Sequence, residues 1–108
     1  MSQEYDQVLI GEPADYPQAF IDEIKSLLKT IPEAKKAWLL MVVHMSGKQN
    51  FLLVVDYKGD YQKIFDVIGQ IVSVHLKQDQ FIDMIPFSDG FGRDAVKSYR
   101  PFYKKGIF

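Results

Sequence analysis

Apolar residues recur along the chain with two different spacings, one typical of helices and one typical of strands. After Pro17 they follow the i, i+4, i+7 and i+11 spacing of one helical face, and Pro32 ends the stretch. Proline is favoured at the first position of a helix, where its missing N–H costs nothing, and Asp15 or Tyr16 is then the expected cap. The buried face is predicted to consist of Phe20, Ile21, Ile24, Leu27, Leu28 and Ile31.

Short runs of β-branched, aromatic and other apolar residues predict strands between these helical stretches. The two longest runs are joined by Ser46-Gly47-Lys48-Gln49-Asn50, which has hairpin length and offers Gly47 for a positive φ. These two strands should therefore pair antiparallel. The expected elements are, in order, a strand at 7–10, the helix that starts at Pro17, strands at 37–45 and 51–56, a helix from a cap at Asp60 to about Lys77, a strand at 81–86, and a short helix at about 93–99 closed by Pro101.

This order predicts a single α+β domain that covers residues 1–108. The sequence has no internal repeat and no low-complexity linker, and its length is common for one domain. We expect a split β-α-β arrangement (β-α-β-β-α-β). It has a four-stranded sheet, both long helices on one face, and a short C-terminal helix and tail.

Both faces of the predicted hairpin are apolar, although a two-layer domain usually keeps polar residues on its open face. One side carries Trp38, Leu40, Val42 and His44; the other carries Ala37, Leu39, Met41, Val43 and Met45. A bare apolar face of this size usually marks an interaction site. We therefore expect a homodimer or larger assembly unless the chain's own tail covers the second face.

Composition and charge narrow the functional classes. Without Cys there is no disulfide, thiolate metal site or cysteine catalysis, which fits the cytosol. The acidic start is unlike a secretory signal, and the longest apolar run is too short to span a membrane. A net charge of −1 gives no overall attraction to nucleic acid. Carboxylates at Asp56 and Asp60 flank the only phosphate-loop candidate, so no nucleotide or other cofactor is expected.

The most unusual composition lies in the tail, where aromatic and basic residues alternate. Such residues dominate interface hot spots. The candidate interface therefore comprises Trp38 and four tail residues, Tyr99, Arg100, Phe102 and Tyr103. The alternative is that the tail packs against its own domain. In either case we expect it to be ordered, since two neighbouring rings are costly to leave in water.

Catalytic chemistry has few candidates in this sequence. His44, His75, Asp56 and Asp83 show none of the i, i+2 or i, i+4 pairing that metal sites on strands and helices usually display. No catalytic, cofactor-binding or metal-binding residue is therefore assigned. The alternative function is a small-ligand-binding or hydrolytic domain that uses His44 with Asp56 and Asp83. It requires these three side chains to share one cavity.

Two stretches near the chain ends resemble a known family. Gly11-Glu12-Pro13-Ala14-Asp15-Tyr16-Pro17 and Tyr99-Arg100-Pro101-Phe102-Tyr103-Lys104 are similar to the C-terminal domain of the enhanced serine sensitivity protein B (SseB) family of bacteria. The resemblance implies a fold but brings no catalytic residues. In the family's usual layout a separate N-terminal domain comes first. Together with the composition, it favours a non-enzymatic interaction or regulatory module of the bacterial cytosol, with a protein partner or self-association.

Overall fold

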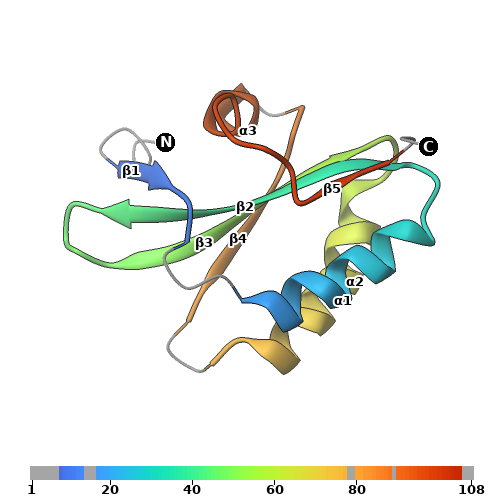
Figure 1. Cartoon of the computed structure of the whole chain (residues 1–108), viewed down its shortest axis with the longest axis horizontal. Helices are drawn as coiled ribbons and strands as arrows, with labels where there is room; N and C mark the ends of the chain where they lie inside the picture. The colour runs from blue at the N-terminus through green and yellow to red at the C-terminus, as the bar shows by residue number, and fades with distance from the viewer. Residues whose placement is uncertain (1–7, 14–16, 78–79, 89, 106–108) are drawn as a thin grey trace.

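A computed structural model describes residues 8–13, 17–77, 80–88 and 90–105 of the chain. The described part is an α+β fold, as predicted (Figure 1). Its elements are, in order, β1 (Val8–Gly11), α1 (Gln18–Lys29), β2 (Ala34–His44), β3 (Gln49–Tyr57), α2 (Tyr61–His75), β4 (Ile82–Pro86), α3 (Gly90–Ala95) and β5 (Tyr103–Lys104).

The sheet is mixed and matches the expected split arrangement only roughly. Its strands lie in the order β1-β2-β3-β4, with β1 and β2 antiparallel, β2 and β3 antiparallel, and β3 and β4 parallel. In a split β-α-β sheet the first strand would lie beside the third instead. Here β1 lies beside β2. Strand β2 extends over 11 residues, and its last four residues, next to the hairpin turn, pair with β1.

Helices α1 and α2 cover one face of the sheet, as the sequence predicts (Figure 1). All six residues of the predicted α1 stripe contribute to this core, and four of them are fully enclosed. Asp60 caps α2 as expected, since its carboxylate accepts a hydrogen bond of 3.0 Å from the Gln62 amide. The proposed α1 caps, Asp15 and Tyr16, lie outside the described residues, and Pro17 precedes the first helical residue.

The opposite face of the sheet is covered by α3 and the chain that follows it. The buried residues here include Trp38, Leu40, Leu52 and Val54 of the sheet and Val96 just after α3. The cover is therefore α3 with its flanking residues, and of the predicted aromatic tail only Tyr99 packs on this face, while Phe102 and Tyr103 join the helix-covered core. With this cover in place, the centre of the second face gives no reason of its own for the homodimer, and the oligomeric state stays a prediction.

The starts of β2 and α3 differ most from the sequence prediction, each for a physical reason. Strand β2 begins at Ala34, three residues before the predicted start, because its first residues pair with β3 on one side and with β5 on the other. Helix α3 begins at Gly90 and ends at Ala95, whereas the sequence predicted a helix at about 93–99. Gly92 is needed there because a Cβ would lie 2.6 Å from the Pro86 carbonyl oxygen, so its small size lets α3 approach β4.

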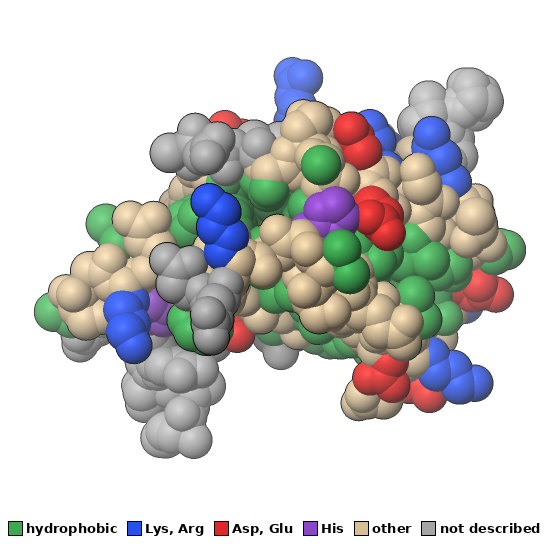
Figure 2. All heavy atoms as spheres, turned by 90° about the horizontal axis from the view of Figure 1, so that it is seen from below, with side chains coloured by type: hydrophobic (Ala, Val, Ile, Leu, Met, Phe, Trp, Pro, Cys, Tyr) green, Lys and Arg blue, Asp and Glu red, His purple; other side chains and the backbone are tan. Residues whose placement is uncertain are grey.

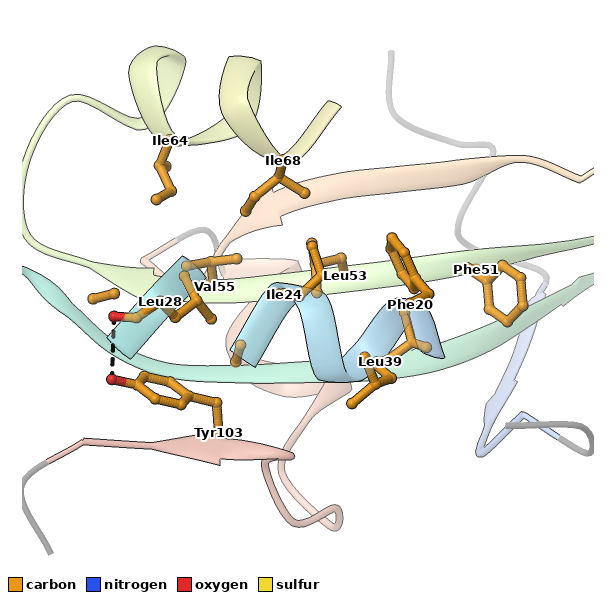
Figure 3. Close-up of a cluster of buried hydrophobic side chains, with 13 residues drawn as sticks. Phe20, Ile24, Leu28, Leu39, Phe51, Leu53, Val55, Ile64, Ile68 and Tyr103 are labelled. Atoms are coloured by element: carbon orange, nitrogen blue, oxygen red, sulfur yellow. Dashed lines mark hydrogen bonds between the residues drawn. The ribbon is translucent and has the colours of Figure 1, made fainter. Parts of the chain in front are cut away.

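Within the described residues the tail, up to Lys105, is packed and forms a strand that was not predicted, and residues 106–108 lie outside the described part. Tyr103 in β5 reaches into the helix-covered core, where it is 7% exposed. Its hydroxyl donates a hydrogen bond of 3.3 Å to the Leu28 carbonyl at the end of α1 (Figure 3). A two-residue strand has too little sequence for any periodicity, so only the aromatic content of the tail pointed to this packing.

Candidate functional site: an interrupted edge of the sheet

The outer edge of β2 is shared by two short strands with a gap between them. β1 ends with Gly11 opposite Met41, and β5 begins with Tyr103 opposite Ala37. Both strands run antiparallel to β2, so they lie along the same edge, one after the other. The three positions of β2 between them have no strand partner on this side among the described residues.

Prolines explain why neither short strand closes the gap. Pro13 follows β1 by two residues and Pro101 precedes β5 by two, so each would reach the position opposite Leu39 if its strand continued. Proline has no N–H to donate to a sheet and is confined to edges and strand ends. The two prolines thus leave the middle of this edge open.

The peptide groups of Leu39 point into the gap. On the β5 side of β2, the carbonyls of Lys35 and Ala37 accept hydrogen bonds from Lys105 and Phe102. Alternate residues of a strand direct their peptide groups to the same edge, and Leu39 is the next in this series. No described residue hydrogen-bonds to its backbone there. Leu40 faces the other way, toward its partner Leu52 in β3.

A cleft of about 370 Å³ opens at this gap. Its volume lies within the range of small binding sites. Residues from both chain ends and from the middle of β2 meet in it, including the two stretches that resemble the family. The lining residues are Glu12, Pro13, Leu39, Leu40, Tyr99, Arg100, Pro101 and Phe102.

Hydrogen bonds hold the walls of this cleft together. The Trp38 indole donates to the Tyr99 carbonyl at 3.1 Å, and the Tyr99 hydroxyl donates to the Ile10 carbonyl at 2.9 Å. Trp38 also stacks on Phe87, with ring centroids 5.1 Å apart. The tail is therefore fixed to β1 and β2 on either side of the cleft, so that its shape is set before any ligand arrives.

Two opposite charges lie at the rim. Glu12 and Arg100 are both exposed and both line the cleft. They form no ion pair with each other, and neither one pairs with another residue in the described ranges. The cleft thus presents a cation and an anion that are free for an external partner.

The five candidate interface residues take different positions. Trp38 and Tyr103 are buried within their own chain, with 4% and 7% of their surface exposed. Tyr99 and Phe102 are half-buried in the wall of the cleft, and Arg100 is exposed at its rim. The accessible part of the predicted surface is therefore Arg100 with the open sides of Tyr99 and Phe102. Trp38 supports Tyr99 from behind through its hydrogen bond to the Tyr99 carbonyl, whereas Tyr103 packs in the helix-covered core.

Sequence reasoning missed Leu39 as part of this site because its side chain reads as core. Pro13 and Pro101 mark the interrupted edge, but their equal distances from β1 and β5 become visible only once the structure shows where these strands lie.

The residues of the alternative hydrolytic site are only partly brought together. His44 Nε2 lies 2.6 Å from the Asn50 side-chain oxygen, and the Asn50 amide nitrogen donates to Asp83 at 3.1 Å. Because that amide nitrogen donates to Asp83, the Asn50 oxygen faces His44 and accepts from its Nε2–H. Asp56 pairs with Lys36 near the opposite end of β3, far from Asn50. The three predicted residues do not share one cavity.

His75 lies on the helix-covered side and has a structural environment. Its Nε2 is 2.5 Å from the Glu23 carboxylate of α1, and its ring lies 5.9 Å from that of Phe20. Figure 2, which views this side, shows positive and negative side chains dispersed among hydrophobic ones. His75 thus joins the C-terminal end of α2 to the middle of α1.

The described residues lack the features of a metal site and of a membrane span. Among residues 8–13, 17–77, 80–88 and 90–105, no cluster of three or more His, Asp or Glu side chains could hold a metal ion. None of the helices in those ranges is long and apolar enough to cross a bilayer.

Comparisons with known proteins agree with the resemblance of the two end motifs. Residues 3–105 match the model of the SseB protein C-terminal domain. Protein SseB of Escherichia coli (strain K12) and Protein SseB of Shigella flexneri are each 25% identical over 104 residues, which cover 93% of this chain and 40% of the relative. The chain thus spans about 40% of the length of these relatives. No solved structure matches it significantly. The chain belongs to the SseB C-terminal domain family.

Proposed function

We propose that this domain is a non-enzymatic protein-interaction module of the bacterial cytosol that binds its partner at the cleft in the edge of β2. One observation carries the proposal: both family-like stretches, which are about 90 residues apart in the sequence, converge on one cleft with an open backbone edge. An open edge is a template for another chain, and aromatic residues beside an Arg are the usual anchors of an interface.

The cleft is small, so it would form the centre of a larger contact. Stable protein interfaces bury roughly 800 Å² on each partner. The surroundings of Arg100 offer further exposed side chains, among them Lys104 and Lys105 of the tail. In such a contact the pocket supplies specificity and the exposed rim excludes water.

Capture from the cytosol with matched variants tests this function. The tagged chain, its Arg100→Glu variant and its Lys97→Glu variant are compared for the proteins they retain, with retained amounts measured by mass spectrometry. Lys97 is also exposed and basic but does not line the cleft. We expect Arg100→Glu to lose a specific partner that the wild type and Lys97→Glu both keep. Identical capture by all three proteins would contradict the proposal.

Self-association is a second form of interaction with its own supporting observation. Leu9, Met45 and Phe81 are 74%, 77% and 63% exposed near the hairpin end of the sheet, beyond the cover of α3. Exposed apolar groups at one end of a sheet favour contact with a second copy. Light scattering at micromolar concentration, with Phe81→Ser as the variant, tests it. A monomer at all concentrations contradicts self-association and leaves the cleft proposal unaffected.

The hydrolytic alternative has weaker support. Asn50 occupies the position between His44 and Asp83, and Asp56 is distant from both. The chain of hydrogen bonds instead fits a polar end of the sheet whose groups satisfy each other.

A further inference from the structure

We infer, on the basis of the interaction role proposed above, that the cleft receives an exposed turn of a partner protein. One residue of this turn hydrogen-bonds to the peptide groups of Leu39. An acidic and a basic side chain beside it meet Arg100 and Glu12. The partner is thus defined by three features: a free peptide group, a tight turn, and mixed charge.

The need for a peptide group follows from the backbone of Leu39. Its N–H and C=O both point toward the cleft, and no described residue bonds to either on that side. A strand edge with both groups open is matched by a ligand that carries a donor and an acceptor at peptide spacing. A lone carboxylate or a lone ammonium would match only one of them.

A turn fits better than an added strand because the gap is closed at both ends. Ala37 and Met41 already have partners in β5 and β1, and four residues of strand span only about 13 Å. A typical strand of about five or six residues would collide with Gly11 at one end and Tyr103 at the other. A ligand must therefore enter across the edge, with its chain leaving the sheet on both sides of one bonded residue.

The charge requirement follows from the two unpaired groups at the rim. Glu12 repels an acidic segment and Arg100 repels a basic one, whereas a segment with one charge of each sign satisfies both. Exposed pairs of this kind add little affinity, but they discriminate between ligands because like charges are disfavoured. Mixed charge is therefore a selectivity rule for this cleft.

The open edge makes a prediction that needs no ligand. The Leu39 amide should exchange its hydrogen at least about tenfold faster than the Leu40 amide, since only the latter is paired within the sheet. Both residues are buried neighbours on one strand, so each controls for the other. Equal protection of the two amides would show that the edge is closed and would overturn the inference.

Titration of the full ¹⁵N-labelled chain with designed peptides tests the ligand class. The probe is a cyclic hexapeptide that presents Lys-Gly-Glu on a turn, compared with cyclic Glu-Gly-Glu and Lys-Gly-Lys versions and a linear Lys-Gly-Glu peptide with a free carboxyl end. We expect the mixed-charge cyclic peptide to shift the Leu39 amide signal and to bind about fivefold or more tightly than the other three. Arg100→Glu should lose this preference, and Lys97→Glu should keep it.

The outcomes separate this inference from the proposed function. No shift at Leu39 with the mixed-charge turn, or equal affinity for the like-charge peptides, overturns the turn model even if Arg100→Glu loses a captured partner. Tighter binding of the linear peptide overturns it in favour of a chain terminus. Conversely, a Leu39 response with unchanged capture by Arg100→Glu would retain the site and reject its role in partner selection.

Discussion

Both faces of the sheet are apolar, but they are covered in different ways. One face lies under α1 and α2, which together provide 27 residues of regular helix. The other lies under the six residues of α3 and the chain behind it. A regular helix covers a face with apolar residues that recur along one of its sides. The short cover depends instead on particular contacts, such as the stack of Trp38 on Phe87 and the close approach at Gly92.

This difference explains why the cleft lies at the edge of the second cover. A tail that crosses a sheet face and then joins its edge must change direction, and here it does so between Tyr99 and Tyr103. The turn includes Pro101, which cannot pair with β2, and it leaves the peptide groups of Leu39 open. The site is thus a consequence of covering a face with an irregular segment.

The largest expected effect comes from a pair of neighbouring leucines that point to opposite faces. Leu53 belongs to the core under α1 and α2, Leu52 belongs to the core under α3 and its flanking residues, and both are 0% exposed. Leu53→Ala and Leu52→Ala should each lower the free energy of unfolding by about 2–5 kcal/mol, measured by urea denaturation. A loss below about 1 kcal/mol for Leu52→Ala alone would show that α3 and the chain behind it leave this face in solution.

The next effect concerns the tail where it joins the edge. Phe102 is half-buried against the helix-covered core, whereas Lys104 is exposed in the same segment. We expect Phe102→Ala to destabilise the protein by up to about 1.5–3 kcal/mol and Lys104→Ala by less than about 0.5 kcal/mol. Thermal melts of both variants measure this. An unchanged melting temperature for Phe102→Ala would mean that the tail is loosely attached.

The sequence predicted the regular parts of this molecule better than the irregular ones. The stripes of α1 and α2 and the hairpin with Gly47, which has φ of 91°, follow from periodicity and turn chemistry. The position of β1 beside β2 and the two residues of β5 do not, because strand order depends on tertiary contacts that no local pattern encodes. The start of α3 was predicted too late, because Gly92, a weak helix former, is needed there for the close approach to β4.

The candidate site was predictable only in part. The aromatic and basic tail was identified from composition, and Arg100, Tyr99 and Phe102 do line the cleft. Trp38 and Tyr103 are aromatic too, but they are buried, since aromatic residues are as common in cores as in interfaces. Leu39 contributes its backbone and not its side chain, and side-chain chemistry alone gives no signal for that.

A smaller effect is expected from the hydrogen bond that ties the tail to β1. Tyr99→Phe removes the bond to the Ile10 carbonyl and should cost about 0.5–1.5 kcal/mol. Tyr103→Phe is the matched control, because it removes a similar bond to Leu28 on the other face. Hydrogen exchange distinguishes them: only Tyr99→Phe should speed exchange in β1. Equal exchange in both variants would show that Tyr99 does not hold this strand.

The smallest effects are expected at the two histidines. His44 and His75 each bond one described side chain, Asn50 and Glu23 respectively, and neither lines the cleft. His44→Gln and His75→Gln should each change stability by less than about 1 kcal/mol, because partly exposed polar pairs contribute little and Gln can keep one hydrogen bond. Both variants should also capture the same proteins as the wild type. Thermal melts and quantitative capture measure the two quantities separately.

If His44→Gln abolished the activity of the protein in cells while its melting temperature and captured partners stayed the same, the hydrogen-bonded chain from His44 to Asp83 would have to act chemically. Protein interaction would then not be the main function of this chain.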